Sequence, residues 1–366
     1  MLYFNQTRAA ILSKIILLLF TASIKADCID TENYCSPLEY DSYCNSTMYR
    51  GSFSIRGDFL YWQPVATGMA YALTRTNLDL PFGPFGPGLV PDNLSLQNVD
   101  VDYGPGYRIG ARYTLFENEW DIDGEYTRFE NSGSDSVLAG NGTLIDTLWD
   151  AISSINTTQA SADLTIGIKA ANICMGRTIS LWDCFSMRPN FGVQWYESNS
   201  KEKIEYIGTT LILDVPFDSR SDIELFCNTK AVGLVAGLDA FWKLPCNFGL
   251  FGNAKYGISR SRFSTGQNQL VFITGQDDVS LTSSTSFRAM IQNFHLKGGL
   301  NWNTPLNLVN CCMNLDIYVA YEMSVYLQAI QITRVLSLGT GFSDANTTNI
   351  GNVAFHGLTT GIKVSF

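Results

Sequence analysis

Apolar and polar side chains alternate with a period of two in one segment of this chain after another. In residues 53–62 the odd positions are mostly aromatic or aliphatic, and Arg56 and Asp58 stand between them. The same alternation occupies residues 107–116 and 313–327. A period of two is typical of a β-strand with one apolar and one polar face. The pattern therefore predicts an all-β protein.

The spacing of these segments predicts ten strands joined by alternating short and long connections. An even number of strands with that alternation is typical of an antiparallel up-and-down transmembrane barrel, with short periplasmic turns and long external loops. A further hairpin within residues 63–102 would raise the count to twelve, and this alternative stays open. The predicted strands cover residues 52–62, 103–116, 119–131, 161–177, 184–197, 227–243, 246–262, 285–303, 313–327 and 353–366. The predicted external loops cover residues 63–102, 132–160, 198–226, 263–284 and 328–352.

Composition favours a membrane barrel over a soluble β-sandwich whose apolar faces fill a core. Hydrophobic residues make up 46% of the chain and charged residues only 16%, a low charge content for a soluble protein. Phe, Tyr and Trp gather at the ends of the predicted strands, which resembles an aromatic girdle at the membrane interfaces. After the N-terminal segment, no apolar run approaches the roughly 18 residues that a membrane helix needs.

The N-terminal segment 1–26 is typical of an export signal. Arg8 and Lys14 precede a short apolar stretch at residues 15–20. Small residues lie near the expected cleavage point after Ala26. We expect residues 27–51 to form a cysteine-containing periplasmic segment and residues 52–366 to form the barrel. Removal of the signal would change the formal net charge from −10 to about −13. An acidic chain argues against nucleic acid as a partner.

The polar faces of the predicted strands would line the interior of the barrel. Rings of charged side chains govern which ions enter a water-filled pore. The predicted pore-lining residues are Arg56, Asp58, Arg108, Arg112, Asp121, Asp123, Glu125, Arg188, Lys255, His295, Lys297, Asp316, Glu322 and Lys363. Loop 132–160 also carries apolar residues at helical spacing, from Leu144 to Ile152, so a short helix could fold into the pore or pack on its own.

Nine cysteines in an exported protein indicate an oxidising compartment, and the odd number favours links to other chains. The ten-strand layout places eight of them on the periplasmic side. Disulfides are expected there, either between envelope proteins or within the chain, for example between Cys174 and Cys184. Buried reduced thiols are the alternative. The disulfide candidates are Cys28, Cys35, Cys44, Cys174, Cys184, Cys246, Cys311 and Cys312.

Catalytic chemistry finds little support in the sequence. The chain has two histidines: His295 on a polar strand face, and His356 near the end of the last strand, where Asp344 could approach it. The spacings typical of metalloproteases, nucleotide-binding loops and serine hydrolases are absent. We therefore predict no enzyme, no cofactor and no metal site.

Several motifs together resemble a known family. They are FSIRGDFLYWQP (53–64), YRIGARYTLFENEWDIDGEYTRF (107–129), FSMRPNFGVQW (185–195), VAYE (319–322) and HGLTTGIKVSF (356–366). As a set they resemble the Legionella-type major outer membrane protein family, which includes chains from chlamydia-related bacteria. The final strand also resembles the C-terminal signature read by the barrel-assembly machinery, with Phe366 as its last residue.

The resemblance implies a porin in the bacterial outer membrane that lets ions and small hydrophilic solutes diffuse through. Its expected partners are membrane lipid, the barrel-assembly machinery and other envelope proteins linked through disulfides, and a homo-oligomer is a further option. Two alternatives stay open. One is a plugged barrel with a structural or adhesive role at the cell surface, and the other is a barrel hydrolase.

Overall fold

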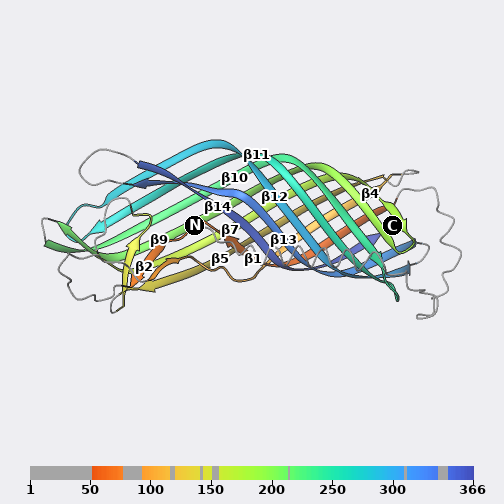
Figure 1. Cartoon of the computed structure of the whole chain (residues 1–366), viewed down its shortest axis with the longest axis horizontal. Helices are drawn as coiled ribbons and strands as arrows, with labels where there is room; N and C mark the ends of the chain where they lie inside the picture. Colours follow the sequence, from red (N-terminus) through yellow and green to blue (C-terminus); the bar gives the residue numbers. More distant parts are fainter. Residues whose placement is uncertain are drawn as a thin grey trace.

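The structure is a computed structural model, and it describes residues 52–76, 93–115, 120–140, 143–150, 156–212, 215–308, 311–336 and 345–366. The predicted signal segment and residues 27–51 lie outside this part of the chain. Within it, fourteen strands form one sheet (Figure 1). They are β1 (Phe53–Ala66), β2 (Ala72–Thr76), β3 (Asn93–Gln97), β4 (Gly104–Thr114), β5 (Trp120–Leu138), β6 (Thr143–Thr147), β7 (Asn156–Arg177), β8 (Ile179–Trp182), β9 (Phe185–Ile212), β10 (Val215–Lys243), β11 (Phe248–Ile273), β12 (Val279–Leu308), β13 (Cys311–Leu336) and β14 (Ala345–Ser365).

Ten of these strands close into a ring. β1 pairs with β4 on one side and with β14 on the other, and every neighbouring pair around the ring is antiparallel. The ring runs β1, β4, β5, β7, β9, β10, β11, β12, β13, β14. A closed ring leaves no unpaired strand edge, which a sheet exposed to lipid requires. The prediction of an antiparallel barrel is confirmed, and the alternative of twelve strands in its wall is wrong.

The four remaining strands are short and add nothing to the ring. β2 pairs with β3 and with β6, and β6 pairs with β7 at Ile145 and Thr157, so residues from two predicted external loops extend the sheet from the ring. β8 pairs only with the start of β9. The predicted helix of loop 132–160 is wrong over residues 143–147, which form β6, because Ile145 and its neighbours pair with β2. Ile152 lies outside the described residues.

Several strands extend far beyond their predicted ends. β9 and β10 remain paired from Trp242 opposite Phe185 as far as Val215 opposite Ile212, so most of the predicted loop 198–226 is strand. The same is true of loop 263–284 on β11 and β12. In these extensions both faces carry polar residues, for example Ser200 inside and Lys201 outside. Further along the extensions, Ile204 and Tyr206 on β9 and Ile223 and Leu225 on β10 are buried among charged residues, so the alternation is present there and the prediction of a loop is wrong.

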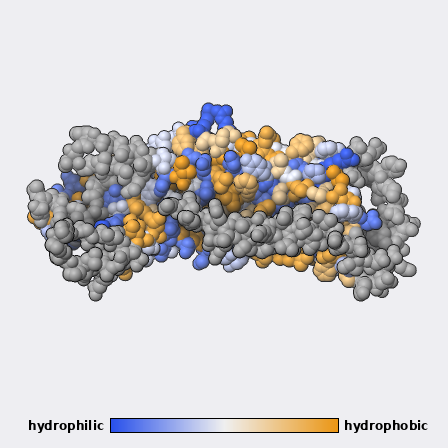
Figure 2. All heavy atoms as spheres, viewed as in Figure 1, coloured by the Kyte–Doolittle hydropathy of each residue, from blue (hydrophilic) through white to orange (hydrophobic). Residues whose placement is uncertain are grey.

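A belt of apolar side chains covers the outside of the wall near its periplasmic end. Leu234 at 70% exposure is typical of the belt. Figure 2 shows hydrophobic residues gathered over the part of the barrel nearer the C-terminus of Figure 1. Other members of the belt include Phe59, Ile109, Ile173, Phe191, Val193, Val232, Leu250, Leu300, Val319 and Ile362. Among the described residues, no helix is long and apolar enough to cross a bilayer.

Candidate functional site: the barrel interior

All fourteen predicted pore-lining residues lie on the inner face of the wall, at the level of the apolar belt. Every one of them takes part in an ion pair. We call this set, together with Asp239, the charged layer. It consists of two clusters and the separate pair of Lys363 and Asp316, whose Nζ and Oδ2 atoms are 3.2 Å apart. Whether these residues line an open pore remains a prediction.

Arg108 is the centre of the first cluster. Its Nη2 donates to Glu322 Oε1 at 2.5 Å, its Nη1 lies 3.4 Å from Asp58 Oδ2, and its Nε donates to Thr127 at 2.9 Å. Arg108 is only 5% exposed and Glu322 1%. Lys297 Nζ lies 3.2 Å from the same Asp58 oxygen. The cluster therefore keeps several charges away from bulk water and depends on mutual pairing.

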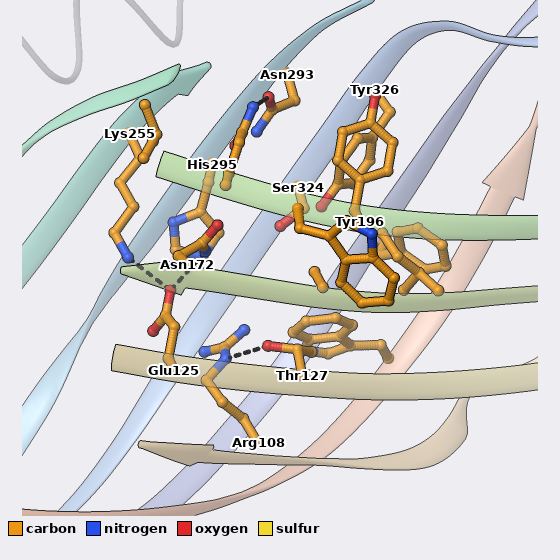
Figure 3. A pocket seen from close by; sticks show the side chains of 17 residues that line it. Arg108, Glu125, Thr127, Asn172, Tyr196, Lys255, Asn293, His295, Ser324 and Tyr326 are labelled. Carbon is orange, nitrogen blue, oxygen red and sulfur yellow. Dashed lines mark hydrogen bonds and ion pairs between the residues drawn. The ribbon is translucent and has the colours of Figure 1, made fainter. Parts of the chain in front are cut away.

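The second cluster is built around Asp123 and Glu125, which pair with Arg56 and Lys255. Arg56 lies 3.0 Å from Asp123 and 2.7 Å from Glu125. Lys255 Nζ lies 2.7 Å from Glu125 (Figure 3). The backbone makes room for these side chains: a Cβ placed at Gly110 would lie 2.7 Å from Arg56 Nε. Small residues on the inner face thus let an arginine lie across the adjacent strand.

At the periplasmic side of the second cluster, two arginines share three carboxylates. Arg188 pairs with Asp121 and, at 2.7 Å, with Asp239. Arg112 is held more loosely, at 3.5 Å from Asp123 and 3.9 Å from both Asp121 and Asp239. Asp239 was not among the predicted residues, although it is a charged residue within the predicted strand 227–243. In the β9–β10 register it lies opposite Arg188.

His295 belongs to the charged layer, and both of its ring nitrogens have hydrogen-bond partners. Its Nε2 lies 2.5 Å from Glu322 and its Nδ1 3.0 Å from Asn253, which in turn donates to Asp239 and so links the two clusters. His356 lies on the outer face, with its Nδ1 2.9 Å from the Tyr321 hydroxyl. Asp344 lies outside the described residues, and no group of metal-ligating side chains occurs among those described.

An aromatic layer covers the charged layer on the external side. Trp62, Phe129 and Phe355 pack with ring centroids 5.5 to 6.2 Å apart, and Tyr196 packs on Tyr326 at 4.9 Å. Between the two layers lies a cavity of about 40 Å³, whose lining includes Arg108 and Lys255 on one side and both tyrosines on the other (Figure 3). Such a space holds about three water molecules.

Two segments from the external side fold into the barrel above the aromatic layer. We call residues 69–76 and 143–150 the inner plug. Trp149 is buried; its Nε1 donates to the carbonyl of Ala70 at 2.8 Å, and Gln267 of the wall donates to the carbonyl of Trp149 at 2.8 Å. Tyr206 of the wall donates to the carbonyl of Tyr71. Loop 132–160 therefore does enter the interior, although not as a helix over residues 143–147.

Glu202 of β9 faces the inner plug and was not predicted, because it falls in a predicted loop. Its side chain is 0% exposed, and neither carboxylate oxygen has a hydrogen-bond partner in the described part of the chain. Its neighbours in register are Leu164 and Leu225. On β9 the outward residues become polar after Trp195, so Glu202 lies beyond the apolar belt. Burial raises the pKa of Glu202 to about 8.

The structure corrects one cysteine prediction. Cys174 is a buried free thiol on the inner face of β7 and is not joined to Cys184. In the β7–β9 register Cys174 lies opposite Gly192, eight residues along β9 from Cys184, or about 26 Å. A disulfide requires Cα atoms about 4.4 to 6.8 Å apart. Neither Cys184 nor Cys246 is a free thiol. Cys28, Cys35 and Cys44 lie outside the described residues.

Several solved structures are similar to this chain at low sequence identity. The OmpT protease of Escherichia coli is 11% identical, with a TM-score of 0.41, covering 86% of this chain and 97% of that one. Ail of Yersinia pestis is 12% identical, with a TM-score of 0.22 and coverage of 87% and 99%. A FadL homologue of Pseudomonas aeruginosa is 7% identical, with a TM-score of 0.28 and coverage of 87% and 90%.

Among curated proteins, no sequence matches this chain. A family model described as "Legionella pneumophila major outer membrane protein precursor" matches residues 46–366. The matched range includes every strand of the barrel and the whole charged layer. The chain therefore belongs to the Legionella major outer membrane protein family and is an outer-membrane β-barrel.

Proposed function

We propose that this protein is a narrow porin that conducts ions and small hydrophilic solutes along its charged layer, and that the inner plug closes it from the external side. The observation that carries the proposal is the polar interior at the level of the apolar belt. An interior of charged side chains inside a lipid-facing wall is the arrangement of a water-filled channel. A barrel that serves only as an anchor has no need for buried charges, each of which costs desolvation.

The inner plug supplies the means of closure. Its packing side chains, among them Met69, Tyr71 and Trp149, are apolar or aromatic and completely buried. Apolar constrictions stop ions because water leaves them. Hydrogen bonds tie the plug to the wall at several points, among them those from Tyr71 to Asp135, from Gln267 to Trp149, from Gln269 to Asp150 and between Tyr206 and both Tyr71 and Leu148. Since the plug comes from connecting segments rather than from the ring, it could move while the wall stays intact.

A second candidate function is a closed barrel with a structural role at the cell surface. The tight packing of the interior favours it, because Arg108 and Glu322 are almost completely buried and the cavity beside them is small. We propose no catalytic role, since both histidines are held by neighbouring side chains and neither contacts a nucleophile.

Conductance of the purified chain in planar bilayers separates the two candidates. We expect brief openings of the native chain, and a several-fold larger open fraction when residues 143–150 are replaced by a Gly-Ser linker. The linker removes Trp149 and its bonds to Ala70 and Gln267. A control variant, Leu138→Ser, changes an exposed residue near the same segment. Silence of both the native chain and the linker variant would leave the structural role.

Ion selectivity should depend on Arg112. This arginine is the most exposed of the four in the charged layer, with 27% of its side chain accessible, and its ion pairs are long. Arg112→Gln removes a positive charge at low structural cost, so we expect the reversal potential in a KCl gradient to move towards cation selectivity. Arg220→Gln, on the outer face, is the matched control. Equal reversal potentials for all three proteins would contradict the placement.

Disulfide links to other envelope proteins remain part of the proposal. After alkylation of whole envelopes, non-reducing electrophoresis should give high-mass species that collapse to the monomer on reduction. The buried thiols Cys174 and Cys227 should be alkylated only after denaturation. A monomer under both conditions would remove the cross-linking role and leave the porin proposal untouched.

A further inference from the structure

A row of cations crosses the outer wall just beyond the apolar belt. Six residues lie opposite one another in register on consecutive strands of the ring. We call them the basic row; they are Arg128 of β5, Lys169 of β7, Glu197 of β9, Lys230 of β10, Arg262 of β11 and Arg288 of β12. Five of the six are cations. Because the strands of a barrel tilt, a row of residues in register runs obliquely to the barrel axis.

The neighbouring rows show that this composition is local. On the belt side the row in register is mainly apolar; it consists of Tyr126, Ala171, Trp195, Val232, Arg260 and Met290. On the external side the next row has one charge, Glu130, followed by Gly167, Asn199, Asn228, Ser264 and Ser286. Positive charge is thus concentrated where the wall passes from apolar to polar, and Arg260 adds to it.

The cations of the basic row have little internal compensation. Lys230 lies 3.7 Å from Glu197 and is 67% exposed, so that pair is weak. Within the described residues, no ion pair involves Arg128, Lys169, Arg262 or Arg288. Arg262 and Arg288 face each other directly across adjacent strands, as do Arg128 and Lys169. Like charges directly opposite in a sheet destabilise it. Anions lying between them would remove that cost.

We propose that the basic row is a docking surface for the phosphate groups of anionic lipids in the outer leaflet of the membrane. The position argues for lipid, because the row borders the surface that lipid chains cover and long basic side chains reach towards the headgroups. The charge argues for phosphate, since Arg forms paired hydrogen bonds to phosphate oxygens. A basic residue near an anionic membrane surface gains about 1 kcal/mol, or roughly fivefold in affinity.

The test compares two triple variants of the full chain in phosphatidylcholine vesicles with and without phosphatidylglycerol. Lys230→Gln, Arg262→Gln and Arg288→Gln remove half of the basic row. Lys201→Gln, Lys203→Gln and Arg220→Gln remove the same charge from the outer wall further from the belt. All six side chains are at the surface, so neither variant should fail to fold.

The measurement is the relative association constant for phosphatidylglycerol over phosphatidylcholine, from quenching of tryptophan fluorescence by brominated lipids. We expect the row variant to lose at least about tenfold in this ratio and the control variant to keep it. The same loss in both variants would indicate net charge alone and would overturn the proposal. An unchanged ratio in the row variant would overturn it too. Conductance is measured separately, so this outcome is independent of the porin proposal.

Discussion

Replacing Arg108 with methionine should lower the free energy of unfolding of the barrel by about 3 to 5 kcal/mol. Methionine has a similar length but no charge, so it leaves Asp58 and Glu322 in the interior without their arginine. A buried charge deprived of its partner costs more than the pair contributed. The measurement is reversible urea unfolding of the refolded barrel in lipid vesicles, followed by tryptophan fluorescence.

A double-mutant cycle identifies the pairing as the cause. Glu322→Gln alone should also destabilise, whereas Arg108→Met with Glu322→Gln should cost clearly less than the sum of the two single changes. Arg220→Gln provides the matched control, because Arg220 is an arginine in an exposed pair with Glu205 and should change stability by less than about 1 kcal/mol. If Arg108→Met stays within 1 kcal/mol of the native chain, water or the remaining partners stabilise Asp58 and Glu322 well enough without Arg108, and the prediction is wrong.

The second large effect concerns Glu202 and pH. Burial raises the pKa of this carboxyl from the ordinary 4.5 to about 8 in the folded barrel. The folded state therefore binds the proton more tightly than the unfolded state does. The contribution of neutral Glu202 is fully present below pH 4.5 and is lost as pH rises to about 8, because over that range the unfolded chain loses the proton while the folded barrel keeps it. The gap between the two values corresponds to at most about 5 kcal/mol.

Glu202→Gln should remove this dependence. At pH 5 the variant and the native chain should unfold at similar urea concentrations, and at pH 9 the variant should be the more stable by a few kcal/mol. Glu205→Gln, three residues along β9 and partly exposed in its pair with Arg220, is the control and should follow the native profile. The contrary result is that the stability of the native chain does not fall relative to that of Glu202→Gln between pH 5 and 9. Glu202 would then have a partner outside the described residues.

The extensions of the strands mark where sequence patterns stop being informative. Alternation identifies a strand only while its two faces differ, as on β1, where Phe59 faces out and Asp58 faces in. On β9, Ser200 and Glu202 face in while Lys201 faces out, so both faces are polar over this short stretch, and only beyond it do Ile204 and Tyr206 give the inner face apolar residues again.

The sequence by itself determined the alternation, the two faces of the membrane-level strands and hence the inward placement of the charged layer, because the period of two is a local property of extended backbone. Only the tertiary structure decided which charges meet. Arg108 and Glu322 are 214 residues apart, and they touch because β1 closes the ring between β4 and β14. The inner plug is likewise a tertiary result: Trp149 and Ala70 come from different connections, and no local pattern indicates that both turn inward.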